Sequence, residues 1–132
     1  VTRAGGVVGA CVWDHGGGRG PLTTLWKAVR DLNPSARDES DLIGVRAGEL
    51  DDIFGQAGLT GLRSSTLTIT VRHATFDEWW EPYTLGVGPA GSYVASLDQA
   101  HRTVLRERCR QLLPPEPFEV SATTWAVTCR VA

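Results

Sequence analysis

The sequence predicts an α/β fold in which strands and helices alternate along a single domain of 132 residues. Three observations support this fold class: a nearly continuous apolar run at 7–13, a strict alternation of Thr with apolar residues at 66–71, and apolar residues at helical spacing after both segments. The composition, with 42% apolar residues and a net charge of −2, is that of an ordinary globular chain. We therefore expect one compact core.

Three segments are predicted to be strands. Residues 7–12 are apolar at nearly every position, which is typical of a strand buried on both faces of a parallel sheet. A glycine-rich loop at 15–21 follows it. Residues 66–71 and 118–131 alternate between apolar and polar side chains, a pattern that indicates two further strands.

Helices are expected between these strands. Apolar residues at three- and four-residue steps predict helices over 22–32 and 96–113 and a shorter one within 48–58. Residues 75–78 form the pattern of a capping box that opens another helix, and the glycines of 86–91 predict a second flexible loop. The strand–helix–helix–strand order implies a right-handed parallel crossover between the first two strands.

Composition also excludes several classes of function. Basic and acidic residues are spread along the chain without a basic stripe, so neither nucleic acid nor a membrane surface is an expected partner. The apolar run at 7–13 is shorter than the roughly 20 residues of a spanning helix. Cys11, Cys109 and Cys129 form no CxxC pair and have no metal-ligand spacing, which favours a reduced, cytoplasmic protein without a metal site.

Four segments, in order along the whole chain, resemble the carboxy-terminal portion of bacterial class I S-adenosylmethionine-dependent methyltransferases that act on small molecules. They are Gly5-Gly6 with the apolar strand that follows it and ends at Trp13-Asp14, and the segments Phe76–Pro82, Gly86–Leu97 and Trp125–Thr128. The resemblance implies a partial Rossmann-like sheet of that family's fifth, sixth and seventh strands, the last one antiparallel between the other two. It also implies flanking helices and a cap-like helical insertion at residues 73–96.

The cofactor segment of that family has no counterpart here. The family binds S-adenosylmethionine with an acidic-Gly-x-Gly-type loop after its first strand, whereas the loop at 16–20 follows what corresponds to the fifth strand and lacks that spacing. The resemblance thus implies S-adenosylmethionine as cofactor, with unknown binding residues. We expect a truncated enzyme that is incomplete without an amino-terminal cofactor-binding half. The alternative is a non-catalytic ligand-binding or interaction module derived from such a methyltransferase.

Candidate site residues follow from the rule that ligands of open α/β sheets bind beyond the carboxyl ends of strands. This rule favours Trp13, Asp14 and His15, with Arg19 as a further substrate-binding candidate. His15 could act as a base for the methyl acceptor, and Asp14 could orient the substrate. Both could equally be loop residues, since Asp commonly caps a turn.

The cap-like insertion supplies aromatic candidates. Trp79, Trp80 and Tyr83 offer flat apolar surface to a small-molecule acceptor or pack on the core, and Tyr93 is a further candidate of the same kind. Strand 7–12 would be central in the complete family sheet, so its edge would be bare in this chain. We therefore expect self-association, or docking of a partner chain, through the exposed edge of strand 7–12.

Overall fold

The computed structural model describes residues 2–131 of the chain, and it confirms the α/β class. The elements follow in the order β1 (Val7–Trp13), α1 (Thr23–Leu32), η1 (Glu39–Asp41), α2 (Glu49–Gln56), β2 (Arg63–His73), α3 (Phe76–Trp80), η2 (Glu81–Leu85), α4 (Gly88–Ser96), α5 (Gln99–Leu112) and β3 (Phe118–Arg130).

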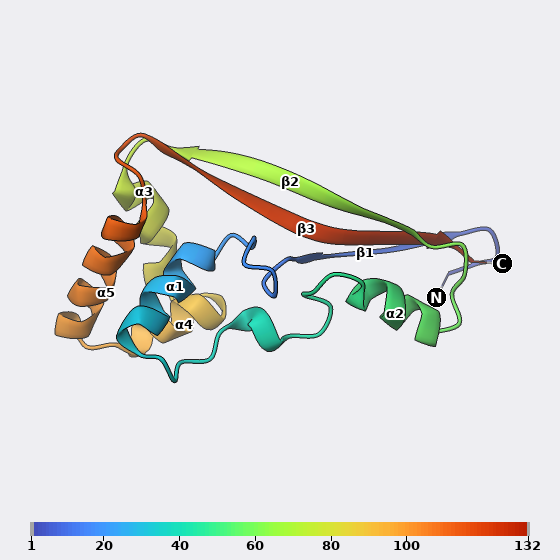
Figure 1. Cartoon of the computed structure of the whole chain (residues 1–132), viewed down its shortest axis with the longest axis horizontal. Coiled ribbons are helices and arrows are strands. Elements are labelled where there is room, and N and C mark those ends of the chain that lie inside the picture. Colours follow the sequence, from blue (N-terminus) through green and yellow to red (C-terminus); the bar gives the residue numbers. More distant parts are fainter. Residues whose placement is uncertain (1, 132) are drawn as a thin grey trace. The chain divides into compact units, whose positions relative to one another are not determined.

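The three strands form one sheet with the order β1-β3-β2 (Figure 1). Strand β3 is antiparallel to β1. The hydroxyl oxygens of Thr68 and Thr123 lie 2.9 Å apart, and the ring of His73 stacks on that of Phe118. Thr68 precedes His73 in β2, whereas its partner Thr123 follows Phe118 in β3. These two strands therefore also run in opposite directions. Strands β1 and β2 are therefore parallel, and the last strand lies antiparallel between them.

The chain divides into two compact units. The sheet unit comprises residues 2–21, Ser40–Ile69 and 121–131, and the helical unit comprises Leu22–Glu39 and Thr70–Val120. Strands β2 and β3 contribute residues to both units. The predicted cap-like insertion, residues 73–96, belongs to the helical unit and contains α3, η2 and α4.

One face of the sheet carries the core of the sheet unit. Leu50 and Phe54 of α2 are buried together with Val127 and Cys129 of β3. Alternate residues of β1 pack against them, namely Val8, Ala10 and Val12. The intervening residues of β1 are exposed, with Val7 at 59%. The expected burial of 7–12 on both faces is wrong for the described residues, because α2 is the helix that covers this strand and it covers one face.

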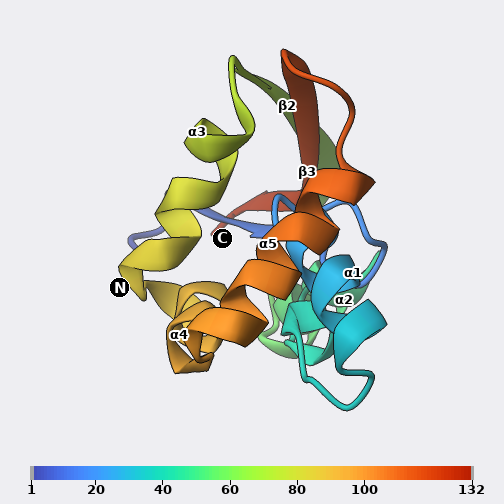
Figure 2. The same cartoon turned by 90° about the vertical axis from the view of Figure 1, so that its left-hand side faces the viewer.

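The core of the helical unit is rich in aromatic side chains, and the helices α1, α3, α4 and α5 that supply it are seen in Figure 2. Its buried members are Leu25, Trp26, Ala28, Val29, Phe76, Trp79, Trp80, Ala90, Val94, Leu105, Cys109 and Phe118. Burial raises the pKa of the Cys109 thiol to about 12, so this thiol stays protonated at neutral pH.

The capping box at the start of α3 is present in part. The hydroxyl oxygen of Thr75, the N-cap residue, accepts a hydrogen bond from the backbone N–H of Glu78 at 3.3 Å, as the sequence pattern predicts. The Glu78 carboxylate in turn accepts a hydrogen bond at 2.7 Å from the backbone N–H of Ala74, the residue before the N-cap, and not from that of Thr75 itself.

The flexible loop expected at 86–91 is wrong in part, because helix α4 begins at Gly88. Pro89 lies in the first turn, where its missing N–H removes no helical hydrogen bond. Gly91 lies against the backbone of Gly86, so closely that a Cβ on Gly91 would come within 2.9 Å of the Gly86 carbonyl carbon. This glycine therefore serves close packing of the segment before α4 on the helix itself.

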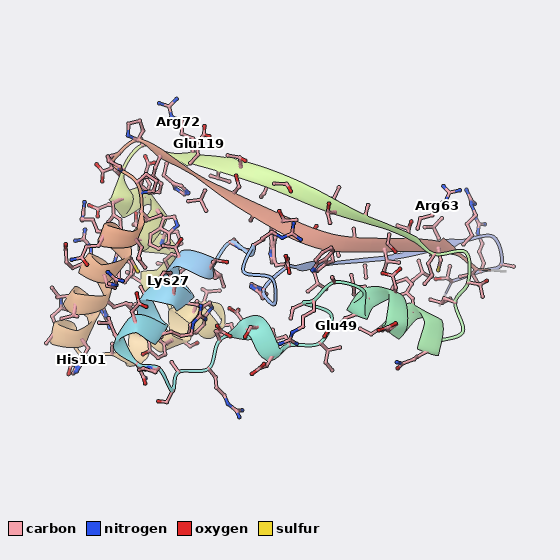
Figure 3. The ribbon with its side chains drawn as sticks, viewed as in Figure 1. Lys27, Glu49, Arg63, Arg72, His101 and Glu119 are labelled. Atoms are coloured by element: carbon pink, nitrogen blue, oxygen red, sulfur yellow. The ribbon has the colours of Figure 1, made fainter. Side chains whose placement is uncertain are left out.

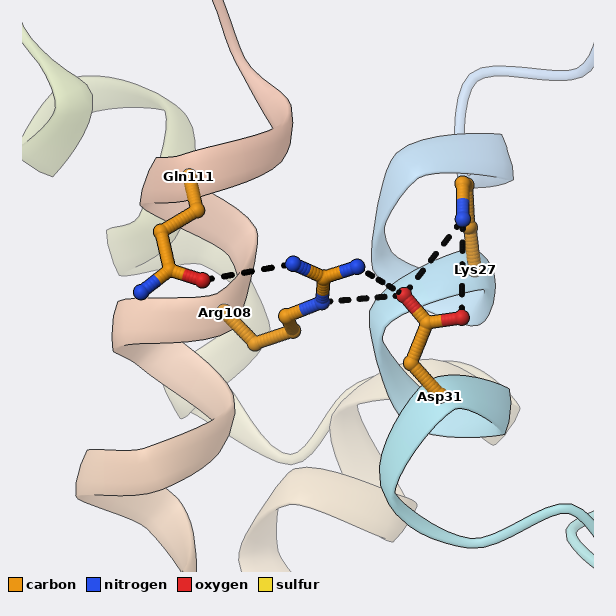
Figure 4. A network of polar contacts seen from close by, with 4 residues as sticks. All are labelled: Lys27, Asp31, Arg108 and Gln111. Atoms are coloured by element: carbon orange, nitrogen blue, oxygen red, sulfur yellow. Dashed lines mark hydrogen bonds and ion pairs between the residues drawn. The ribbon is translucent and has the colours of Figure 1, made fainter.

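A network of polar contacts joins α1 and α5 (Figure 4). The Nε and Nη2 atoms of Arg108 donate to Oδ2 of Asp31 at 2.9 and 2.6 Å. Lys27 Nζ lies 3.4 Å from the same oxygen, and Gln111 Oε1 accepts from Arg108 Nη1 at 3.2 Å. The hydrogen bonds from Arg108 are the largest cause of a lowered pKa at Asp31.

Replacing Arg108 by glutamine is expected to raise the pKa of Asp31 toward its ordinary value, and a carboxyl ¹³C NMR titration measures this directly. A lowered folded-state pKa stabilises the fold above the unfolded-state pKa, and this contribution disappears as pH falls through the folded-state value. In Arg108→Gln the free energy of unfolding should therefore fall less as pH drops from the unfolded-state pKa of Asp31 to its folded-state pKa. Lys27→Gln is the matched control, and it should raise the pKa of Asp31 by less than Arg108→Gln does. A larger rise in Lys27→Gln than in Arg108→Gln would contradict the network as described.

Candidate functional site

Asp14, the first residue after β1, is a buried acidic side chain with 1% of its surface exposed. Its Oδ2 accepts a hydrogen bond from Arg19 Nε at 2.6 Å. Its Oδ1 accepts from the backbone N–H of Gly17 at 2.8 Å and from Trp125 Nε1 at 3.0 Å. Its own backbone N–H donates to the carbonyl oxygen of Thr123 at 2.9 Å. The side chain thus joins the loop after β1 to β3.

The charge state of Asp14 follows from two opposing effects. Burial alone disfavours the ionised form, whereas the hydrogen bonds from Arg19, Gly17 and Trp125 and the positive charge of Arg19 favour it. The donors prevail, and the pKa of Asp14 is lowered. An ionised carboxylate whose oxygens already accept three hydrogen bonds is suited to holding its neighbours in place rather than to accepting a proton from a substrate.

Arg19 and Trp125 complete this group of residues, which we call the Asp14 cluster. The guanidinium carbon of Arg19 lies 5.0 Å from the centre of the Trp125 ring, within cation–π distance. The Arg19 side chain is 50% exposed, so Asp14 and Trp125 fix its orientation while its terminal nitrogens remain accessible. Such an arginine can bind a carbonyl or an anionic group of a ligand.

The glycines after β1 allow this loop to fold closely onto its own side chains. A Cβ on Gly17 would lie 2.4 Å from Asp14 Oδ2, and a Cβ on Gly20 would lie 2.6 Å from Nδ1 of His15. His15 is half-buried, and its backbone N–H donates to the carbonyl oxygen of Trp13 at 2.8 Å. The loop therefore presents His15 beside the Asp14 cluster, and its glycines are required by close contact as well as by turns.

The predicted residues in the sheet unit lie together, because they are neighbours in the chain and the loop folds back on itself. Trp13 is half-buried opposite Thr124. The strand-end rule found Asp14, His15 and Arg19, whereas Trp125 was predicted only as a strand residue. Its role depends on a hydrogen bond that spans 111 positions of the chain, and no local pattern indicates such a contact.

The aromatic candidates belong to the helical unit. Their positions match the second of the two expected roles, packing on the core. Trp79 and Trp80 are 4% and 6% exposed, and the ring of Tyr83 lies 5.0 and 6.3 Å from theirs. Burial is the main cause of a raised pKa at Tyr83, so its hydroxyl stays protonated at neutral pH. Contact of the two tryptophans with a substrate stays a prediction and would require them to become more exposed.

A second buried carboxylate lies in the helical unit. Glu39 is 9% exposed, and its Oε2 accepts a hydrogen bond from Trp26 Nε1 at 2.5 Å. Trp26 is itself in the core, as the helical spacing predicts, and its ring lies 5.9 Å from that of Tyr93. The sequence gives no sign of the buried role of Glu39, because this residue lies in the polar, charged stretch 37–41.

Residues 2–131 also bear on two other kinds of site. No group of three or more His, Cys, Asp or Glu side chains in this range is arranged to hold a metal ion. None of the helices described combines the length and apolar character needed to cross a membrane. A scan against models of protein families and a search of curated proteins found no match. The geometry of the site therefore carries the functional argument.

Proposed function

We propose that this chain is the acceptor-side portion of a class I S-adenosylmethionine-dependent methyltransferase that acts on a small molecule. The observation that supports this most is the sheet order, in which the last strand, β3, lies antiparallel between the parallel strands β1 and β2. A plain succession of right-handed crossovers would instead leave all strands parallel. The same arrangement is what the resemblance of the sequence to this family implies for its last three strands.

In this proposal the loop after β1 binds the acceptor. It lies at the carboxyl end of a strand, where open α/β sheets bind their ligands. Asp14 stays ionised and holds Arg19, whose exposed nitrogens bind a polar group of the acceptor. His15, the next residue after Asp14 in this loop, takes a proton from the acceptor as a general base. Trp13 and the half-exposed Trp125 provide apolar contacts beside these polar groups.

The glycine-rich loop after β1 is a poor match to a cofactor-binding loop. The glycine loop uses its own N–H groups internally: Gly16 donates to Val45, Gly17 to the Asp14 carboxylate, and Gly18 to His15. A cofactor-binding loop instead needs backbone donors that point toward the ligand. The proposal therefore assigns cofactor binding to residues outside this sequence.

The test joins this chain to an amino-terminal half of a class I methyltransferase that carries the first four strands of that fold. The fusion and the half alone are incubated with S-adenosylmethionine and a panel of small phenols, amines and carboxylates, and formation of S-adenosylhomocysteine is measured. Turnover is expected in the fusion alone, with at least a tenfold decrease on Arg19→Ala. A fusion that binds S-adenosylmethionine but transfers no methyl group would favour the alternative, a non-catalytic binding or interaction module.

The alternative, a non-catalytic interaction module, is supported by the exposed outer strands of the sheet. Among the described strands, β1 and β2 are the outer ones. On β1 the side chain of Val7 is 59% exposed, and Cys11 is exposed as well. Outer strands with apolar side chains readily pair with another chain. We propose strand 7–12 as the pairing edge, in keeping with its nearly continuous apolar sequence.

Self-association through this edge is expected at micromolar concentration, and light scattering over a concentration series measures it. Cys11 is exposed on β1, so Cys11→Lys adds a charge to the pairing strand and should weaken association at least tenfold. Val71→Lys places the same charge on the other outer strand and should leave association unchanged. A monodisperse monomer in the unmodified chain would contradict the proposal.

A further inference from the structure

The helical unit contains a cavity of about 360 Å³ formed by α1, α4 and α5. It is lined by Val29, Leu32, Asn33, Tyr93, Leu97, His101, Val104 and Leu105. Its volume is at the lower end of the range of small-molecule sites in proteins. The cavity thus has room for a molecule of one or two rings, and most of its lining is apolar.

The apolar lining includes both buried and exposed side chains. Val29 and Leu105, at 0% and 2% exposure, form the buried part of the wall. Leu32 and Val104 are 46% and 53% exposed, so apolar surface remains in contact with water around the opening. A bound apolar molecule would cover this surface, and removal of apolar area from water favours binding.

The polar part of the lining offers hydrogen-bond donors. Asn33 Nδ2 lies 3.5 Å from the hydroxyl oxygen of Tyr93 and donates to it. Ser35 donates to Asn33 Oδ1 at 2.8 Å, which fixes the orientation of this amide. Because the Tyr93 oxygen acts as acceptor in this bond, its own proton is available to a ligand. The Tyr93 hydroxyl and the second N–H of Asn33 together complement a carbonyl oxygen.

The charge of the lining also restricts the ligand. None of the described residues that line the cavity is an Asp, Glu, Lys or Arg. His101 lies in the first turn of α5 (Figure 3), and its Nδ1 is 2.8 Å from Oδ1 of Asp98, which lies outside the cavity lining. A charged ligand would lose its hydration without gaining an ionic partner, so an uncharged one is favoured.

We propose that this cavity binds a small, uncharged molecule with an apolar ring system and one carbonyl oxygen. The rings contact Val29, Val104 and Leu105, and the carbonyl oxygen accepts hydrogen bonds from Tyr93 and Asn33. This site belongs entirely to the helical unit. Its occupation does not depend on the methyltransferase proposal, because no residue of the Asp14 cluster takes part.

The test is a titration of the whole chain with 1-tetralone and with tetralin, its analogue without the carbonyl group. Binding is followed by the methyl ¹H–¹³C NMR signals of Val29, Val104 and Leu105. The ketone is expected to bind about tenfold more tightly than the hydrocarbon, the effect of one well-placed hydrogen bond. In Tyr93→Phe this preference should fall to about threefold or less, while tetralin binds as before.

A second pair of variants tests the location. Val104→Trp fills the opening and should weaken tetralone binding at least tenfold, whereas Val87→Trp places the same side chain at a position that is 76% exposed and outside the lining. Val87→Trp should bind tetralone like the unmodified chain. Equal affinities for ketone and hydrocarbon, or unchanged binding in Val104→Trp, would overturn the proposal. Tyr93→Phe keeps the ring and its packing, so it remains decisive even if Val104→Trp fails to fold.

Discussion

Replacement of Phe76 by alanine is expected to lower the free energy of unfolding of the helical unit by about 4 kcal/mol. The Phe76 side chain is 2% exposed, and its ring centre lies 5.7 Å from that of Trp79 and 6.2 Å from that of Trp80. Removing the ring leaves a cavity among side chains that cannot fully close it. Domains are typically stable by only about 5–15 kcal/mol, so much of the stability would be lost. Urea denaturation followed by tryptophan fluorescence measures the change.

Two further substitutions separate the sources of this effect. Phe76 also lies beneath two guanidinium groups, with Arg110 at 4.3 Å and Arg106 at 5.2 Å from its ring centre. Phe76→Leu retains most of the apolar volume but removes the aromatic face, and it should cost about 1–2 kcal/mol. Leu85→Ala, at a residue that is 68% exposed, should change stability by less than about 0.5 kcal/mol. Similar costs for Phe76→Ala and Leu85→Ala would contradict the assigned core.

The secondary structure could be predicted well where local patterns determine it. The helical spacing at 96–113 and the alternation at 66–71 correspond to α5 and β2, because each pattern places apolar residues on one side of its element. The beginning of α4 was missed because glycines disfavour a helix by local propensity. Here a close contact between Gly86 and Gly91 requires glycine, and tertiary packing outweighs that propensity.

The site shows the same division between local and distant information. Asp14, His15 and Arg19 were found because they lie within six positions of one another at the end of a predicted strand. Trp125 was missed as part of the site, since it reaches Asp14 from β3. Burial of 7–12 on one face could not be predicted either, because an apolar run indicates how many faces a strand buries only when its neighbours are known.

Replacement of Asp14 by alanine is expected to destabilise the sheet unit by about 3 kcal/mol, because it removes three hydrogen bonds at once. The backbone N–H of Gly17 and Nε1 of Trp125 would lose their acceptor, and Arg19 would lose its ionic partner. Asp14→Asn keeps an oxygen acceptor for the first two groups, but its NH2 group cannot accept from Arg19. It therefore loses the charge and one hydrogen bond and should cost about 1–2 kcal/mol. Hydrogen exchange of the Gly17 amide and urea denaturation measure the two effects.

The pH dependence of the free energy of unfolding distinguishes an ionised Asp14 from a neutral turn residue. Its pKa in the folded chain is lowered, so its contribution is fully present above the unfolded-state pKa of about 3.9 and is lost as pH falls through the folded-state value. The difference in stability between the unmodified chain and Asp14→Asn should therefore be largest near neutral pH and shrink on acidification. A difference that stays constant down to pH 2 would mean that Asp14 acts through shape and neutral hydrogen bonds alone. In that case Arg19 would not be held by charge, and its proposed role in orienting an acceptor would lose its physical basis.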